Sequence, residues 1–197
     1  MLSEDQKIKT RRQLKEWLAV ENWRYPLSAR RILPYLLQIS EGAILRRHTR
    51  LLRTTEYHVN TGHRIRAALY HAMLMRIQMR TGIHIPLNSC AKGLTIYHVQ
   101  PGGLNGNATA GENLRLMPGA IAIGDDKTDL APTIGDNVTL GPNCILVGGI
   151  TLADNITVGA GAVVTHSFTE PGITIAGVPA RKIRGPEPEN GGAADAD

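Results

Sequence analysis

The second half of the chain repeats a six-residue pattern, and this period restricts the available folds more than any other feature. Between residues 134 and 169, position one of each hexad is Ile, Leu or Val. Position five is apolar too. The residue at position five and the residue at position one of the next hexad therefore point inward, and they flank one outward-pointing residue at position six, such as Thr139. Each such triplet predicts a very short strand. The hexads are IGDNVT, LGPNCI, LVGGIT, LADNIT, VGAGAV and VTHSFT.

The residues between the triplets favour tight corners. In Gly141, Pro142 and Asn143, glycine and asparagine tolerate positive φ and proline presets a turn. Short strands joined by repeated corners predict a solenoid whose coils supply one another's hydrogen bonds and bury a continuous apolar interior. The period alone leaves the handedness open. The same frame extends backwards through two series of inward residues: Leu104, Ala110, Leu116 and Ala122, then Ala108, Leu114 and Ala120.

Three regions are expected along the chain. Residues 1–82 are expected to form an α-helical region, because their apolar residues recur at helical spacing. Residues 83–184 are expected to form the solenoid, with residues 124–133 extruded as a loop from one corner. Residues 185–197, GPEPENGGAADAD, are expected to be a disordered acidic tail.

Helix boundaries and one helix face are also predicted. Ser3 with Gln6 forms a capping-box pattern, and Gly82 is placed to end the last helix. A further helix start is expected at residues 26–28, at Pro26 and Ser28. In the last helix, helical spacing runs through Leu69, Ala72, Met73, Arg76 and Ile77. The cluster of Met73, Met75 and Met79 is predicted to pack in the core rather than to form a binding groove.

Charge is distributed unevenly. Residues 1–82 carry 16 Lys/Arg against 6 Asp/Glu, whereas residues 83–197 carry 6 against 11. We interpret the basic half as a solvated helical face with an anionic partner, either a membrane surface, bound peripherally, or a biosynthetic partner. No nucleic-acid-binding motif accompanies the charge, so nucleic acid is not expected as a partner.

Cysteine usage and apolar runs indicate a cytoplasmic protein. Cys90 and Cys144 are far apart and have no CxxC spacing, so neither a disulfide framework nor a zinc site is expected. The first residues, MLSEDQKIKTRR, are polar where a signal peptide needs an apolar core, and no apolar run is long enough to span a bilayer.

The frame breaks near one histidine. Extended backwards, it places His98 at an inward position and Gly102 at the next one. Violations of a consistent pattern concentrate at functional sites, so His98 is a candidate catalytic residue. The alternative is that the frame simply decays towards its start, since Lys92 and Pro86 break it too.

A family resemblance adds to this interpretation. The hexads and ITIAGVPARKI, residues 173–183, resemble the left-handed β-helix acyltransferases. The order of segments is similar to that of the serine-acetyltransferase branch: helices come first, then HVQPG at residues 98–102, then the repeats and GVPA. The resemblance covers residues 83–184. It implies a left-handed parallel β-helix with three flat faces, a homotrimer with active sites between subunits, and acetyl-CoA as co-substrate. No metal is expected, since the cysteines and histidines form no ligand cluster.

The resemblance also implies roles for particular residues. His98 would be the general base that removes the proton of an acceptor hydroxyl. Backbone N–H groups near Gly124 would stabilise the oxyanion, although plain turn geometry explains this glycine equally well. The residues expected to contact acetyl-CoA are Gly159, Gly161, Ala176, Gly177, Arg181 and Lys182.

Departures from serine acetyltransferase bear on the acceptor. That family has an Asp directly before its catalytic His and an Arg-His pair before the post-loop repeats; here Tyr97, Leu130 and Ala131 match these positions. The family's upstream acidic residue matches Ile83, so a backbone carbonyl or His84 is expected to orient His98. A zwitterionic amino acid would be left without its polar partners, which is costly.

The expected acceptor is therefore a sugar. The chain resembles the serine-acetyltransferase-like proteins associated with polysaccharide biosynthesis in three segments, which are HVQPG, a short loop and LAPTIGDN. We expect acetyl transfer to a hydroxyl of a sugar or polysaccharide precursor, a small-molecule or glycan acceptor, with Tyr97 at the acceptor side. Serine O-acetyltransfer in cysteine biosynthesis and a non-catalytic trimeric scaffold remain as alternatives. A metal-dependent hydratase is disfavoured, because residues 83–197 offer only His84, His98 and His166.

Overall fold

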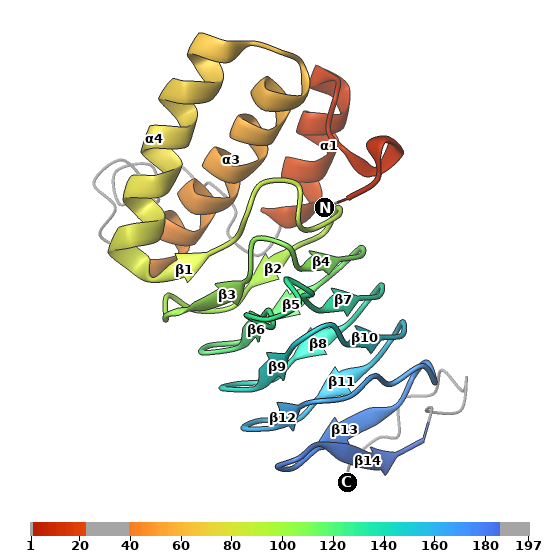
Figure 1. The fold of residues 1–197 in the computed structure, drawn as a ribbon. Helices are drawn as coiled ribbons and strands as arrows, with labels where there is room; N and C mark the ends of the chain where they lie inside the picture. The colour runs from red at the N-terminus through yellow and green to blue at the C-terminus, as the bar shows by residue number, and fades with distance from the viewer. Residues whose placement is uncertain (1, 23–39, 186–197) are drawn as a thin grey trace, which may run out of the picture.

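The computed structural model describes residues 2–22 and 40–185. Helices gather at one end of a stack of β-strand coils, and the carboxyl-terminal strands close the other end (Figure 1). The predicted helix start at Pro26 and Ser28 lies outside the described residues, as do residues 186–197 of the predicted tail. The helices are η1 (Glu4–Gln6), α1 (Arg11–Glu21), α3 (Glu41–Asn60) and α4 (Arg64–Thr81).

The helix ends follow local sequence. The predicted capping box at Ser3 and Gln6 is present, but it starts only a single 3-10 turn. Helix α1 begins behind a second capping box, formed by Thr10 and Gln13. Helix α4 ends at Gly82 as predicted, because this residue adopts a φ of 72° that favours glycine. No helix among the described residues is long and apolar enough to cross a membrane.

The strands form three sheets, which are the three faces of a parallel β-helix. The sheet orders are β1-β3-β6-β9-β12, β4-β7-β10 and β2-β5-β8-β11-β13-β14. All strand pairs are parallel except β13 with β14, which closes the last coil. The strands are β1 Ile83–His84, β2 Thr95–Ile96, β3 Gly102–Leu104, β4 Thr109–Ala110, β5 Arg115–Leu116, β6 Ile121–Ile123, β7 Thr133–Ile134, β8 Thr139–Leu140, β9 Ile145–Val147, β10 Thr151–Leu152, β11 Thr157–Val158, β12 Val163–Val164, β13 Thr174–Ala176 and β14 Arg181–Arg184.

The hexad frame is confirmed in the coils that follow β3. Val138, Leu140, Cys144 and Leu146 are fully buried inside the solenoid, and so are both earlier inward series. Corner asparagines adopt positive φ as predicted, and they also bond from coil to coil. Asn113 donates its side-chain amide to Asn137, and Asn137 donates to Asn155.

Two corners are longer than the frame requires by two residues or more. Equivalent inward positions on consecutive faces of a coil are usually six residues apart along the chain, as are Leu116 and Ala122. Their partners Ile96 and Leu104 are eight apart, so the corner after β2 carries two extra residues. Ala122 and Ile134 are twelve apart, and a loop leaves the corner between β6 and β7.

The predicted core packing of the α4 methionines is wrong for Met73 and Met79. Leu69 is 60% exposed, Met79 is 81% exposed and Met73 also faces solvent, whereas Leu74 and Ile77 are buried. The physical reason is that α4 is apolar around most of its circumference, so periodicity does not select the face that packs on α3. The exposed side carries large apolar groups without a partner in the described chain.

A buried ionic cluster joins the helices to the first coil. Arg53 of α3 donates to Glu21 of α1 (2.7 Å) and to Glu56 (2.9 Å), and all three side chains are buried. Arg53 also donates to the carbonyls of Cys90 (2.9 Å) and Ala91 (2.8 Å). Although burial opposes it, the two carboxylates raise the pKa of Arg53.

The carboxylates of this cluster reach the coil as well. Glu21 accepts from the backbone N–H groups of Gly93 and Leu94, and Glu56 accepts from that of Asn88. Every charged group is therefore paired and hydrogen-bonded, which is the condition for burying charge without a large penalty. The cluster fixes the position of α1 and α3 on the solenoid.

We predict that Arg53→Met lowers the free energy of unfolding by about 3–5 kcal/mol, because it leaves two carboxylates buried without their partner. Urea denaturation followed by circular dichroism measures this loss. The matched control is Arg12→Met, which removes an exposed arginine paired with Glu16 and should change stability little. Equal effects of the two substitutions would contradict the assigned role of the cluster.

His48, also buried on α3, gives the fold a pH dependence. Burial lowers the pKa of His48 to about 4. The unfolded chain, with an ordinary value near 6.5, therefore binds more protons between about pH 4 and 6.5. This contribution to stability is complete above pH 6.5 and is lost as the pH falls towards 4.

We predict that His48→Phe flattens the pH profile of stability. The loss of unfolding free energy between pH 7.5 and pH 4 should shrink by about 3 kcal/mol, since each pKa unit corresponds to 1.36 kcal/mol. Urea denaturation of both proteins across this range measures the difference. A variant with the profile of the parent protein would show that His48 does not titrate in this way.

Candidate active site

His98 lies on the lengthened corner between β2 and β3. Its side chain is 59% exposed, so the prediction that it occupies an inward position is wrong. Leu94 and Ile96 occupy the inward positions of this coil instead. The two extra corner residues shift the frame, and the histidine is thereby placed on the outer surface of the edge.

Glu41, the first residue of α3, holds this histidine. Its carboxylate lies 3.2 and 3.3 Å from Nδ1 of His98 and accepts a 2.7 Å bond from the backbone N–H of Val99. The orienting group is therefore a carboxylate, which corrects the expectation of a backbone carbonyl or His84. His84 belongs to β1, and its own carbonyl packs against Gly103.

This pairing determines what the imidazole can do. A carboxylate at Nδ1 favours the tautomer with the proton on Nδ1, and Nε2 then carries the lone pair. The exposed Nε2 can accept a proton from a group that approaches the corner. The bond from Val99 to the same carboxylate fixes the corner backbone together with the ring.

Gly124 lies at a different edge of the solenoid. It follows β6, whereas His98 precedes β3, and these two strands are parallel neighbours on one face. Within one chain, the edge that carries His98 and the edge that carries Gly124 are therefore separated by the width of one face, which is three strand residues or about 10 Å. A Cβ at Gly124 would lie 3.2 Å from the carbonyl oxygen of Leu130 and 3.3 Å from the side-chain amide of Asn105.

The small residues predicted to contact acetyl-CoA share an edge with His98. Gly159 and Gly161 form the corner between β11 and β12, and Ala176 and Gly177 lie beside them on the next coil. A Cβ added at Gly159 would lie 2.8 Å from that of Ala176, whereas one at Gly161 would meet open space. The edge is thus narrow and accessible, which suits the approach of an extended molecule to the backbone.

The two predicted basic residues differ in their surroundings. Arg181 begins β14 with an exposed side chain. Lys182 donates to both oxygens of Glu170 (2.6 and 2.7 Å), so a carboxylate engages its ammonium group. An incoming phosphate would have to compete with Glu170 for this lysine.

The positions that depart from serine acetyltransferase are spread around the coils. Tyr97 is half-buried directly after β2, beside His98. Ile83 is buried in β1, Leu130 is exposed on the loop over Gly149, and Ala131 packs against the core. Of these residues, only Tyr97 is a sequence neighbour of His98.

Both cysteine thiols of the chain are buried. Burial raises the pKa of the Cys90 and Cys144 thiols to about 12, so neither is a nucleophile near neutral pH. Among the described residues no group of three His, Cys, Asp or Glu side chains is arranged to hold a metal ion. The pair of His98 and Glu41 is an acid–base arrangement that this surface presents.

Sequence reasoning missed Glu41. Ser40 accepts from the backbone N–H of Ala43 and Glu41 follows it, so the local pattern signals only the start of a helix. Nothing local indicates that this helix end lies over a corner 57 residues further along the chain.

Comparisons with known proteins agree with the repeat. A family profile described as the hexapeptide repeat of succinyl-transferase matches residues 133–166. The galactoside O-acetyltransferase of Escherichia coli (strain K12) is 44% identical over 52 residues, 26% of this chain and 25% of that protein. The bifunctional protein GlmU of Acaryochloris marina (strain MBIC 11017) is 36% identical over 72 residues, 36% of this chain and 16% of that protein. The chain thus spans a quarter or less of these relatives.

Solved structures match over a longer stretch. A serine acetyltransferase from Neisseria gonorrhoeae has a TM-score of 0.66 and 24% identity, and the match covers 91% of this chain and 70% of that chain. A serine acetyltransferase in complex with CoA has a TM-score of 0.63 and 17% identity, over 88% and 71%. The chain therefore has the left-handed parallel β-helix fold of these proteins, with helices before it, as expected.

Proposed function

We propose that this protein is an acetyl-CoA-dependent O-acetyltransferase that acetylates a hydroxyl of a sugar or polysaccharide precursor. The observation that carries the proposal is the imidazole of His98, held by Glu41 at the edge of a hexapeptide-repeat solenoid. The repeat matches a galactoside O-acetyltransferase, and the fold matches a serine acetyltransferase that has been solved with CoA. Both support acetyl-CoA as the donor.

The mechanism is a direct transfer in a ternary complex. Nε2 of His98 removes the proton of the acceptor hydroxyl as its oxygen attacks the thioester carbonyl carbon. The carbon–sulfur bond then breaks, and His98 returns the proton to the leaving CoA thiolate. Glu41 favours the neutral tautomer with its proton on Nδ1, which leaves the lone pair on Nε2, and it stabilises the imidazolium that forms. Backbone N–H groups near Gly124 stabilise the oxyanion.

The proposed assembly is a homotrimer with active sites between subunits. His98 and Gly124 lie at opposite edges of one face in a single chain, so a site that contains both needs a second copy. The neighbouring subunit would bring its Gly124 edge to the His98 edge. Acetyl-CoA would then lie along the edge that runs from His98 to Gly159, Gly161, Ala176 and Gly177, with Arg181 and Lys182 at its phosphate end.

A sugar is favoured over serine as the acceptor. Tyr97, Leu130 and Ala131 offer no charge to an amino acid, and burying unpaired carboxylate and ammonium groups is costly. The aromatic ring of Tyr97, beside His98, suits the apolar face of a sugar. The proposed setting is polysaccharide biosynthesis in the cytoplasm, and the basic helices are the proposed contact to a membrane or a biosynthetic partner.

The proposal predicts acceptor-dependent release of CoA. Purified protein is incubated with acetyl-CoA and, separately, with serine, nucleotide sugars and oligosaccharides, and free thiol is measured. We expect turnover with a sugar acceptor, and His98→Ala should lower kcat/KM about 100- to 10,000-fold. Turnover of serine alone would contradict the assigned acceptor. Undiminished turnover by His98→Ala would contradict the mechanism.

Glu41 is predicted to act as a positioning residue. Glu41→Gln should lower kcat roughly 10- to 100-fold and leave the KM for acetyl-CoA unchanged. The substitution removes the preference of His98 for the tautomer with its proton on Nδ1, and it does not alter the acetyl-CoA contacts. Glu41→Asp should restore part of kcat. The matched control is Glu16→Gln, which alters an exposed carboxylate on α1 that is paired with Arg12. Full activity of Glu41→Gln would show that His98 works without this carboxylate.

A further inference from the structure

The outer face of α4 carries large apolar side chains in solvent. Ile65 is 87% exposed, and Leu69 and Met79 are exposed as well. At 100° per residue these three positions fall within about 80° of one another on the helix. They therefore form one stripe on the side opposite to the buried Leu74 and Ile77. We refer to the stripe of Ile65, Leu69 and Met79 as the outer face of α4.

Arginines lie beside this stripe, and Arg76 lies within it, between the positions of Leu69 and Met79 on the helix. Arg64, Arg66, Arg76 and Arg80 are all exposed on the same helix. The acidic residues of α3 and α4 are Glu41, which pairs with His98, and Glu56, which is buried against Arg53. The outer face thus combines apolar side chains with positive charge, and both carboxylates of these two helices are engaged elsewhere.

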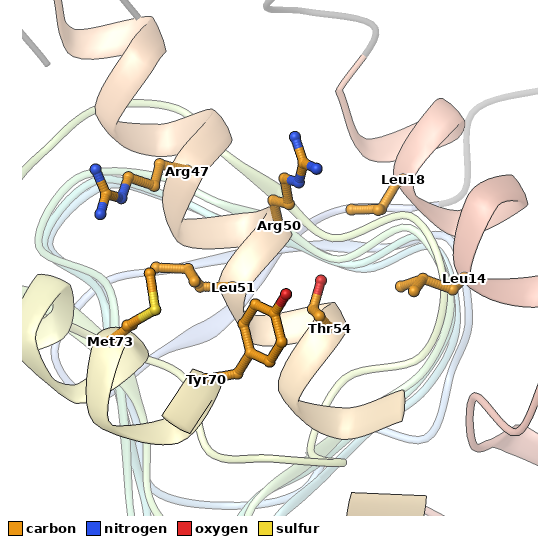
Figure 2. Close-up of a pocket in the computed structure, with 8 residues that line it drawn as sticks. All are labelled: Leu14, Leu18, Arg47, Arg50, Leu51, Thr54, Tyr70 and Met73. Atoms are coloured by element: carbon orange, nitrogen blue, oxygen red, sulfur yellow. The ribbon is translucent and has the colours of Figure 1, made fainter. Parts of the chain in front are cut away.

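A groove beside α4 has the same character. It lies between α1, α3 and α4, and Figure 2 shows Leu14, Leu18 and Met73 around it together with Arg47 and Arg50. A second hollow shares Leu14 and Tyr70 with this groove. The second hollow adds Arg11, Lys15 and Arg66. No carboxylate lines either hollow.

Charge complementarity restricts what can cover this surface. A symmetric contact with the same face of a second copy would place arginines against arginines, and like charges in contact are destabilising. A nucleic acid would satisfy the arginines but leave Ile65 and Met79 in water. An anionic bilayer satisfies both, because apolar side chains enter the headgroup–acyl boundary while arginines meet lipid phosphates.

We propose that the outer face of α4 docks peripherally on an anionic lipid bilayer. Helix α4 lies along the membrane surface with Ile65, Leu69 and Met79 inserted, and Arg64, Arg66, Arg76 and Arg80 contact phosphate groups. The groove of Leu14, Tyr70 and Met73 accommodates lipid chains at the border of this contact. The proposal stands independently of the acetyl transfer, since none of these residues belongs to the His98 edge.

Vesicle co-sedimentation of the full chain tests the proposal. The vesicles contain phosphatidylcholine alone or phosphatidylcholine with 30% phosphatidylglycerol, a composition set by the experiment, at low and high NaCl. We expect binding to the anionic vesicles only, weakened by salt. Arg76→Gln with Arg80→Gln should weaken binding roughly tenfold or more, because each arginine near an anionic surface contributes. Ile65→Ser with Met79→Ser should weaken it as strongly.

Matched controls lie on the solenoid. Arg115→Gln removes one exposed cation from β5, and Ile183→Ser removes one exposed apolar side chain from β14. Both should bind vesicles as the parent protein does, and circular dichroism of every variant confirms folding. Sedimentation velocity is measured on the same proteins in the absence of lipid.

The results of these experiments distinguish an anionic bilayer from a second copy of the chain as the partner of the outer face of α4. Anionic-vesicle binding that is lost only in the α4 variants supports the proposal. Absence of binding at low salt, or equal binding by α4 and control variants, overturns it. A smaller assembly in Ile65→Ser with Met79→Ser, without vesicle binding by the parent, assigns the face to a second copy and also overturns it. CoA release with a soluble acceptor is unaffected in every case if the acetyltransferase proposal holds.

Discussion

The arrangement of the molecule depends on the burial of Arg53. Its guanidinium ties α1, α3 and the first coil together through two carboxylates and two backbone carbonyls. A charge this deep is tolerated only when every donor is satisfied, so the geometry of all partners is fixed at once. The helices are consequently a rigid extension of the solenoid and not a flexible attachment.

This rigidity reaches the candidate active site. Glu41 lies twelve residues before Arg53 on the same helix, about 18 Å along its axis. Because Arg53 fixes one part of α3 on the coil, the start of the helix is held over the corner of His98. The two extra residues of that corner turn the imidazole outward to meet the carboxylate. The buried anchor at Arg53 and the candidate site at Glu41 thus belong to one helix.

The sequence predicted the features that repeat and missed the features that occur once. Inward residues such as Leu140 and Leu146 follow from the hexads, since every coil imposes the same alternation. His98 was placed inward because the frame carries no information about a corner lengthened by two residues. Met79 was assigned to the core because periodicity does not distinguish it from Leu74 and Ile77. Glu41 could not be predicted, since its contact with His98 depends on how α3 packs, which Arg53 decides.

The tautomer of His98 tests the central claim most directly. In two-dimensional ¹⁵N NMR of selectively labelled protein above pH 8, the account predicts a protonated Nδ1 and an unprotonated Nε2 for His98. The same spectrum of Glu41→Gln should lose this preference, because the carboxylate that holds the Nδ1 proton is gone. A protonated Nε2 in the parent protein, or identical spectra of the two proteins, would contradict the account.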